Sequence, residues 1–495
     1  MNYYLGIDCG GTFIKAAIYD KQGKSYGTCR QSLSIISTQP GWAERDLEAL
    51  WNACTEVISG AIRNAKVTAE NIKAVGISAQ GKGLFLLDKN QKPLGHGILS
   101  SDQRALNIVK QWQAEGIPQK LYPMTRQTLW TGHPVSILRW LKEHQPERYN
   151  QIGSILMSHD YLRFCLTGNV ACEETNISES NFYNMETGEY DSHLAGHLEI
   201  PEIMTALPPI VGSSEIAGYI NKSAAEKTGL AESTPVVGGL FDVVSTALCA
   251  GLDDETKLNA VMGTWSVVSG ITNHIDYNQA LPFVYGRYAQ TNRFIVHEAS
   301  PTSAGNLEWF TKQWNLDNYH EINAAVRSLP KAESSIFFIP FLYGSNAGLG
   351  MQAGFYGLQS LHTKAHLLQA IYEGVVFSLM FHLERMLQRF PHTKVLRVTG
   401  GPARSKEWLS ILADLSGLTV EAPQVEETGC LGAALMGMVG SGEFASVEQA
   451  LAIVQASVER IEPDSTVYEQ YQKKYAKYKL LIECLQRFNQ DKDKL

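Results

Sequence analysis

Three glycine turns, each directly after a run of β-prone residues, constrain the fold of this chain more than any other feature. Gly10-Gly11-Thr12 follows "YYLGIDC", Gly263-Thr264 follows "LNAVM", and Gly400-Gly401 follows "KVLRVT". Glycine lets backbone N–H groups approach a ligand closely, so such a turn can cradle phosphate oxygens or can only reverse the chain. Three of these turns, divided between the two halves of the chain, favour phosphate binding. None of them is a Walker A or Rossmann motif.

The N-terminal segment has the pattern of a mixed α/β domain. Residues 3–8 and 13–20 are predicted to form a hairpin around the first turn, and residues 23–33 a third antiparallel strand. Apolar residues at helical spacing predict a helix over residues 46–65, and the β-branched run 72–80 predicts a buried strand.

A comparable order of elements begins again near residue 235. Residues 234–244 have the pattern of a strand, a loop and the start of a helix, and residues 258–272 that of a second hairpin. Residues 394–417 predict a strand, a glycine turn and a helix, and the tail from residue 467 to 495 predicts a final helix. Because 495 residues exceed what one hydrophobic core usually supports, we expect two domains, 1–243 and 244–495.

Composition and charge exclude several classes of protein. The formal net charge of -8 disfavours a general binder of nucleic acid or of a membrane surface. No run approaches the ~18 apolar residues of a membrane span, and the N-terminus has no signal-peptide pattern. The eight cysteines are scattered without a CxxC pair, which is typical of reduced thiols. We therefore expect a cytoplasmic protein that binds neither nucleic acid nor membranes.

Two aspartates stand where phosphoryl chemistry would need carboxylates. Asp8 ends the first predicted strand beside the first turn, where it would repel a phosphate unless a cation such as Mg²⁺ lay between them. Alternatively, Asp8 only initiates the turn. Asp242 stands where a strand gives way to a helix, and could accept the proton of an attacking hydroxyl group. Alternatively, it is the N-cap of that helix.

The order of motifs resembles the FGGY family of carbohydrate kinases over essentially the full length of the chain, and within it the L-xylulose kinases. The resemblance rests on "GIDCGGTFIKAAIYD", "GWAERDLEALW", "IKAVGISAQGKG", "SSDQR", "GGLFDVVSTALCAG", "MGTWS", "GFYGLQSLHTKAHLLQAIYEG", "TGGPARSKEW" and "GCLGAALMG". Nine matches in one order are hard to obtain by chance.

The resemblance implies an α/β fold of two actin-like ATPase (ribonuclease H-like) domains, each a mixed β-sheet with flanking helices, around a central cleft. It implies that ATP and Mg²⁺ bind there and that a sugar hydroxyl group attacks the γ-phosphate. The expected reaction converts a ketopentose, L-xylulose, to its 5-phosphate. The alternatives are 3-keto-L-gulonate, another pentulose or a polyol as the substrate, and an actin-like ATPase without a sugar substrate. The expected partners are the sugar and ATP, and a homodimer is compatible with the resemblance.

The family's functional positions can be carried over to this chain. Asp242 matches the general base, and Asp8, the candidate Mg²⁺ ligand, falls in the first phosphate hairpin. Residues 1–243 are expected to form the sugar side together with that hairpin. The resemblance implies nucleotide contacts at Gly10, Gly11, Thr12, Lys15, Gly263, Thr264, Gly400, Gly401, Ala403 and Gly432. It implies sugar contacts at Gln80, Asp102 and Arg104, and Lys82 is a further candidate on the sugar side.

The sequence departs from the family pattern at two places. The first hairpin of the family usually reads DxGT, whereas here Gly11 stands in place of that threonine and Thr12 follows. Typical xylulose kinases carry a Met-His pair where this chain has Gly81-Lys82. A cation at Lys82 favours an acidic sugar if the side chain faces the substrate, and has no such effect if it points to solvent.

Overall fold

A computed structural model describes residues 1–263, 265–277, 282–348, 350–454 and 458–492. The chain forms two compact units whose segments alternate along the sequence. Unit 1 contains Met1–Gly251, Thr272–Val296 and Val425–Val454, and unit 2 contains Leu252–Ile271, His297–Gln424 and Gln455–Leu495. The predicted domain boundary after residue 243 stays a prediction.

Unit 1 is built on a mixed sheet with the strand order β13-β14-β5-β1-β2-β3, and β15 also pairs with β5. The pairs β1–β2 and β2–β3 are antiparallel, which confirms the predicted hairpin and third antiparallel strand. The predicted buried strand is β5, and it pairs parallel to β1. These strands are β1 (Tyr3–Cys9), β2 (Phe13–Tyr19), β3 (Ser25–Ser32), β5 (Ile72–Ala79), β13 (Ile216–Tyr219), β14 (Pro235–Val237) and β15 (Leu240–Phe241).

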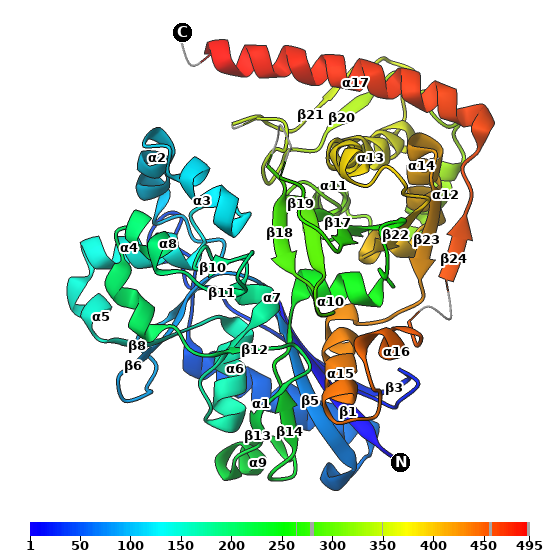
Figure 1. The fold of residues 1–495 in the computed structure, drawn as a ribbon. Coiled ribbons are helices and arrows are strands. Elements are labelled where there is room, and N and C mark those ends of the chain that lie inside the picture. The colour runs from blue at the N-terminus through cyan, green and yellow to red at the C-terminus, as the bar shows by residue number, and fades with distance from the viewer. Residues whose placement is uncertain (264, 278–281, 349, 455–457, 493–495) are drawn as a thin grey trace. The chain divides into compact units, whose positions relative to one another are not determined.

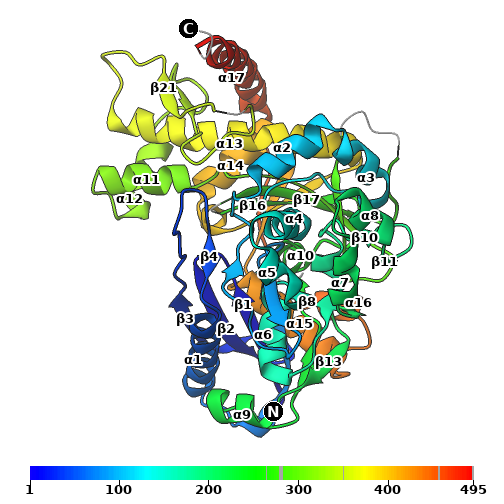
Figure 2. The ribbon, with the colours of Figure 1, turned by 90° about the vertical axis from the view of Figure 1, so that its left-hand side faces the viewer.

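Helices cover both faces of this sheet. Helix α1 (Leu47–Ala65) packs on β2 and β3, while α15 (Thr428–Gly440) packs on β1 and β5 (Figures 1 and 2). Gly6 and Gly76 are neighbours in the β1–β5 register. A Cβ atom would lie 1.8 Å from the Cys430 carbonyl oxygen at Gly6 and 2.0 Å from the Ala433 carbonyl oxygen at Gly76. Only glycine therefore permits so close an approach of α15.

The rest of unit 1 carries a second hydrophobic core around short helices and strands between β5 and β13. These elements are β6 (Phe85–Asp88), β7 (Gly97–Ile98), α2 (Leu106–Ala114), α3 (Ile117–Thr125), α4 (Pro134–His144), α5 (Pro146–Asn150), β8 (Ile152–Leu156), α6 (Ser158–Thr167), β9 (Cys172–Glu173), α7 (Glu174–Ile177), β10 (Tyr183–Asn184), β11 (Glu189–Tyr190), α8 (Ser192–His197) and β12 (Ile210–Val211). The short strand β4 (Glu44–Arg45), which precedes α1, pairs with β7. Unit 1 also contains α9 (Lys222–Thr228), α10 (Asp242–Cys249), β18 (Val284–Arg287) and α16 (Val447–Leu451).

Unit 2 repeats the central arrangement of unit 1. Its strands follow the order β19-β17-β16-β22-β23-β24, with an antiparallel β16–β17 hairpin and β22 parallel to β16. The same relation joins β1, β2 and β5 in unit 1, so the predicted repeat is confirmed as a repeat of topology. The strands are β16 (Lys257–Met262), β17 (Ser266–Thr272), β19 (Phe294–Ser300), β22 (Val395–Thr399), β23 (Thr419–Pro423) and β24 (Val458–Ile461), with β20 (Phe337–Ile339) and β21 (Gly354–Tyr356) paired separately.

The helices of unit 2 are α11 (Gly305–Gln313), α12 (Tyr319–Arg327), α13 (Lys364–Arg389), α14 (Lys406–Ser416) and α17 (Ser465–Lys492). Helix α14 begins as predicted, because the Ser405 hydroxyl oxygen accepts a hydrogen bond from the Trp408 amide, and it ends at Gly417 with a φ of 72°. The long C-terminal helix α17 (red in Figure 1) packs on α14. Its Lys474 forms a 2.5 Å buried ion pair with Glu373 of α13. Within the described ranges, no helix is long and apolar enough to cross a membrane.

Candidate active site

Asp8 lies near the end of β1, on the face of the sheet that α15 covers. A Cβ atom on Gly429 would lie 2.3 Å from the carboxyl carbon of Asp8, so this carboxyl group packs against the first turn of α15. Burial raises the pKa of Asp8 to about 6, Lys15 lowers it and Glu427 raises it further. Asp8 is paired with Lys15 in the β1–β2 ladder and is not a residue of the turn itself. A half-buried carboxylate beside a helix N-terminus suits a site for a hard cation and anionic oxygens.

The first glycine turn is loosely packed. It closes through a 2.9 Å bond from the Gly10 amide to the Phe13 carbonyl oxygen. A Cβ atom would find no atom closer than 3.6 Å at Gly10 or 3.5 Å at Gly11, and Thr12 is exposed. A side-chain carbon at these glycines would therefore make only ordinary contacts, in contrast to Gly6, where it would clash with α15.

Arg45 holds the first turn from behind, and reasoning from the sequence did not assign it a role. Its guanidinium group donates to the Gly10 carbonyl oxygen at 3.2 Å and to the Gly11 carbonyl oxygen at 2.5 Å. In a trans peptide the N–H group points opposite to the carbonyl group, so the amides of Gly11 and Thr12 point away from Arg45. Arg45 is only 2% exposed. The sequence signal that could have pointed to Arg45 is its place in "GWAERD", the short segment that also contains Glu44.

Lys15 does not project freely from the hairpin. Its Nζ atom lies 2.6 Å from Oε2 of Glu427, and the two side chains are about one-third exposed. Glu427 immediately precedes α15 and has a φ of 53°. The pair joins β2 to the start of α15, beside Asp8, and places a compensated positive charge near the turn.

Asp242 is the first residue of α10 and directly follows β15. The N-cap of this helix is Phe241, so the alternative that Asp242 is itself the N-cap is wrong by one residue. Burial raises the pKa of Asp242 to about 7, and the charge of Asp8 raises it further, whereas the Val243 amide and Lys82 lower it. A carboxyl group that titrates near neutral pH is matched to proton transfer under physiological conditions.

Lys82 points into the protein. Its side chain is 13% exposed, its Nζ atom lies 2.5 Å from Oε2 of the fully buried Glu179, and it lies 4.9 Å from the centre of the Phe241 ring. The alternative that Lys82 points to solvent is therefore wrong. The neighbouring glycine also has a structural reason, because a Cβ atom at Gly81 would lie 2.3 Å from the Phe241 ring.

Asp102 and Arg104 form a buried network. Asp102 accepts a 2.7 Å bond from the Ala43 amide and a 2.8 Å bond from Nε of Arg104. Nη2 of Arg104 donates to Glu44 at 2.6 Å. The guanidinium group stacks 3.9 Å from the centre of the Trp42 ring. Gln80, which directly follows β5, is half-buried beside the first turn. Of the residues predicted to contact sugar, Asp102 is thus the one most fully engaged by the protein itself.

The predicted nucleotide residues of unit 2 lie at two adjacent turns. The Gly263 amide donates to the Trp265 carbonyl oxygen at 3.1 Å, while Thr264 lies outside the described residues. Gly400 has a φ of 95°, and a Cβ atom there would lie 2.4 Å from the Met262 carbonyl oxygen. A Cβ atom at Gly401 would meet nothing within 4 Å. Because β16 and β22 are parallel, both turns leave the same edge of the sheet.

The last two predicted nucleotide positions, Ala403 and Gly432, lie in different units. The Ala403 amide donates to the Gly400 carbonyl oxygen at 3.1 Å and so helps to shape the turn after β22. Gly432 lies in α15 of unit 1, where a Cβ atom would come within 2.0 Å of the Ser245 hydroxyl oxygen. Gly432 is therefore a close contact between α15 and α10. Its role toward the nucleotide stays a prediction.

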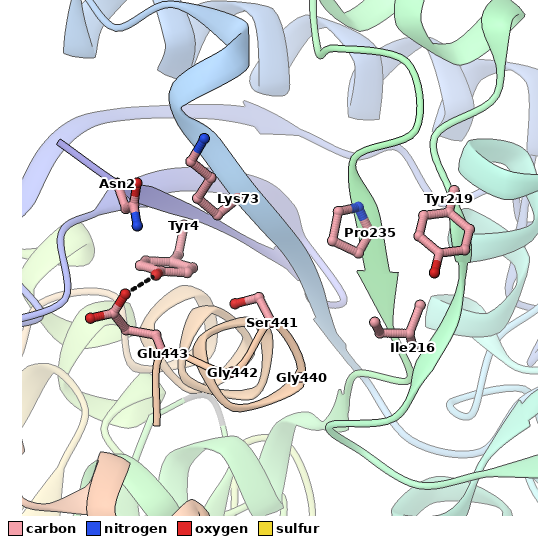
Figure 3. A pocket seen from close by; sticks show the side chains of 10 residues that line it. All are labelled: Asn2, Tyr4, Lys73, Ile216, Tyr219, Pro235, Gly440, Ser441, Gly442 and Glu443. Atoms are coloured by element: carbon pink, nitrogen blue, oxygen red, sulfur yellow. Dashed lines mark hydrogen bonds between the residues drawn. The ribbon is translucent and has the colours of Figure 1, made fainter. Parts of the chain in front are cut away.

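A pocket of about 400 Å³ in unit 1 has none of the predicted site residues in its lining (Figure 3). It is lined by Tyr4 and Lys73, near the starts of β1 and β5, and by Glu443 after the C-terminal end of α15. Asp8 and Gln80 lie at the opposite ends of the same strands. The Tyr4 hydroxyl group donates to Glu443 at 2.8 Å within the lining of this pocket. Its position separates it from the candidate catalytic groups.

Known carbohydrate kinases match this chain over almost its full length. Sequence models of the FGGY family of carbohydrate kinases match residues 3–249 (N-terminal domain) and 258–441 (C-terminal domain). The chain is 65% identical over 485 residues to a probable L-xylulose kinase of Pasteurella multocida, covering 98% of this chain and 99% of that protein. It is 61% identical over 487 residues to the L-xylulose/3-keto-L-gulonate kinase of Escherichia coli, covering 98% of each. A ligand-bound xylulose kinase from Lactobacillus acidophilus has the same fold, with a TM-score of 0.90, 21% identity and 98% coverage of both chains.

Proposed function

The chain belongs to the FGGY family of carbohydrate kinases, and on this premise we propose that it phosphorylates L-xylulose to L-xylulose 5-phosphate. It is a sugar kinase that transfers a phosphoryl group from ATP to an alcohol and uses Mg²⁺. The observation that carries the choice of sugar is the identity of 61–65% to proteins named as L-xylulose kinases.

The residues around Asp8 fit the metal. A half-buried carboxyl group with a neighbouring helix N-terminus, beside a loosely packed glycine turn, provides the single carboxylate that Mg²⁺ commonly takes alongside phosphate oxygens and waters. When bound, Mg²⁺ neutralises negative charge on the transferring phosphoryl group. The amides of Gly11 and Thr12, directed by Arg45, donate hydrogen bonds to phosphate oxygens and hold them in place.

Asp242 serves as the general base in this proposal. Its carboxylate accepts the proton of the sugar hydroxyl group as that oxygen attacks the γ-phosphate, and Gln80, Lys82, Asp102 and Arg104 hold and shape the sugar side. The raised pKa of Asp242 supports this role, because a base is most effective when its pKa lies near the working pH. Gly263, Thr264, Gly400, Gly401, Ala403 and Gly432 are assigned to the nucleotide.

A second candidate substrate is 3-keto-L-gulonate, which the name of the Escherichia coli relative includes. A cation at Lys82 would suit its carboxylate. However, Glu179 compensates that cation at 2.5 Å and is itself fully buried, so a bound carboxylate would compete with it. A neutral pentulose leaves the buried pair intact, which favours L-xylulose.

The organisation of the protein is also part of the proposal. Residues 1–243 would carry the sugar side and the first phosphate hairpin, and residues 244–495 the nucleotide side. Eight free cysteines support a cytoplasmic location, since thiols persist in reducing compartments. The exposed side chains of Tyr356, Leu358 and Leu361, each more than half exposed, support association of two copies, which light scattering can measure.

Asp242→Asn tests the proposal most directly. The asparagine keeps the shape of the side chain and removes the base, so kcat with L-xylulose should fall by roughly 10²- to 10⁴-fold while ATP affinity is retained. ADP release would be measured with L-xylulose, D-xylulose, L-ribulose, glycerol and 3-keto-L-gulonate. Asp317→Asn, at an exposed position, is the control. Parental turnover by Asp242→Asn would refute the assignment of the base, and preference for another sugar would refute that of the substrate.

A further inference from the structure

A buried hydrogen-bond chain connects helix α7 to the backbone just before Asp242. The Thr175 hydroxyl group donates to Oε2 of Glu173 at 2.7 Å, and the Phe241 amide donates to the same hydroxyl oxygen at 2.9 Å. Glu173 is 0% and Thr175 1% exposed. No residue of this chain of contacts belongs to the predicted site.

The direction of these bonds is set by chemistry. An ionised carboxylate can only accept, so the single proton of the Thr175 hydroxyl group is committed to Glu173. The oxygen of Thr175 is then left with lone pairs that can accept only from a donor such as the Phe241 amide. Glu173 is itself held by the amides of Thr175 and Asn176 at 2.8 and 3.2 Å and by the Ser213 hydroxyl group at 2.8 Å.

The same short helix holds a second loop of the site. Oδ1 of Asn176 accepts a 3.0 Å bond from the backbone amide of Lys82. Consecutive residues of α7 thus fix the backbone beside Asp242 and the backbone at Lys82. The segment before Phe241 is constrained as well, since Gly239 has a φ of 99° and Arg163 donates to the Gly238 carbonyl oxygen.

We propose that Thr175 is a positioning residue for Asp242, acting through the Phe241 amide, with Glu173 fixing the direction of its hydroxyl group. Asp242 is the residue that follows Phe241, so the tether controls where β15 ends and where α10 presents the carboxyl group. This inference rests on the proposed role of Asp242 as the base. Because small displacements of a reacting group are costly, loss of the tether should act on kcat.

The test compares Thr175→Val, Thr175→Ser and Ser213→Ala in the full-length protein. Valine keeps the shape of threonine and removes the hydroxyl group, so we expect kcat to fall by roughly 10- to 100-fold. The KM values for ATP and L-xylulose should stay within about twofold, because Thr175 is assigned no contact with either substrate. Thr175→Ser should restore kcat. Ser213→Ala removes another buried hydroxyl donor of Glu173 without touching Phe241, so it should keep the parental kcat.

Three results would overturn the inference: parental kcat for Thr175→Val, equal loss in Thr175→Val and Ser213→Ala, or failure of serine to restore the rate. If Thr175→Val does not fold, Thr175→Cys replaces it, since a thiol is a weak hydrogen-bond partner, and kcat should again fall at unchanged KM. Asp242→Asn is assayed in parallel. Activity in that variant would refute the proposed base, whereas an inactive Asp242→Asn with a fully active Thr175→Val would refute only the role of Thr175.

Discussion

Adding one carbon atom at Gly76 should push helix α15 away from the first sheet. The new Cβ atom would lie 2.0 Å from the carbonyl oxygen of Ala433, and an ordinary contact needs at least 3.4 Å. Strand β5 cannot yield, because it is paired with β1 on one side and with β14 and β15 on the other. The helix must therefore move by about 1.4 Å, and overpacking of this kind typically costs about 1–3 kcal/mol of folding free energy.

The same displacement should reach the candidate active site. The first turn of α15 packs on Asp8, and Glu427 just before it holds Lys15 at 2.6 Å. A misplacement of about 1 Å can cost as much as 10²-fold in rate. We therefore expect Gly76→Ala to lower kcat/KM by roughly 10- to 100-fold, in addition to its effect on stability.

Urea unfolding followed by circular dichroism, together with ADP release, measures both effects. Gly196→Ala is the matched control, since Gly196 lies in α8 and a Cβ atom there would meet nothing within 4 Å. Alanine at this helical position should be neutral or stabilise by up to ~1 kcal/mol. If Gly76→Ala unfolds at the same urea concentration as the control and keeps its activity, the close approach of α15 to β5 is refuted.

Three other perturbations have defined outcomes. Arg45→Lys loses the forked donor behind the first turn. ATP should therefore bind roughly 10- to 100-fold more weakly in calorimetry, while the KM for the sugar stays unchanged. Unchanged ATP affinity would contradict the role of Arg45. His133 has a pKa lowered to about 3 by burial, so it is neutral when folded whereas the unfolded chain binds its proton below about pH 6.5. Between pH 7.5 and 5 the parent should therefore lose about 2 kcal/mol more unfolding free energy than His133→Gln, and equal losses would refute this. Glu179→Gln leaves the Lys82 cation uncompensated. The kcat/KM for 3-keto-L-gulonate, divided by the kcat/KM for L-xylulose, should therefore rise about tenfold. A constant ratio would show that Lys82 does not face the substrate.

Much of the fold was predictable because its signals are local. The hairpins around Gly10 and Gly263, the helix from Ser405 to Gly417 and the C-terminal helix are encoded by contiguous residues whose spacing, caps and turns act over a few positions. The positions of Asp8 and Asp242 at strand ends were predictable for the same reason. The exact start of α10 at Asp242 was not, since helix ends depend on neighbouring contacts.

The partners of those residues were decided only by the tertiary structure. Arg45 reaches Gly11 across 34 positions, Lys82 reaches Glu179 across 97, and Thr175 reaches Phe241 across 66. Nothing in a local pattern specifies such pairs, because they arise when whole elements pack against one another. The sequence by itself determined that Gly10-Gly11-Thr12 is a turn that can approach phosphate. Packing of β4 behind it decided which way its amides point, because the two terminal nitrogens of the buried Arg45 donate to the carbonyl oxygens of Gly10 and Gly11.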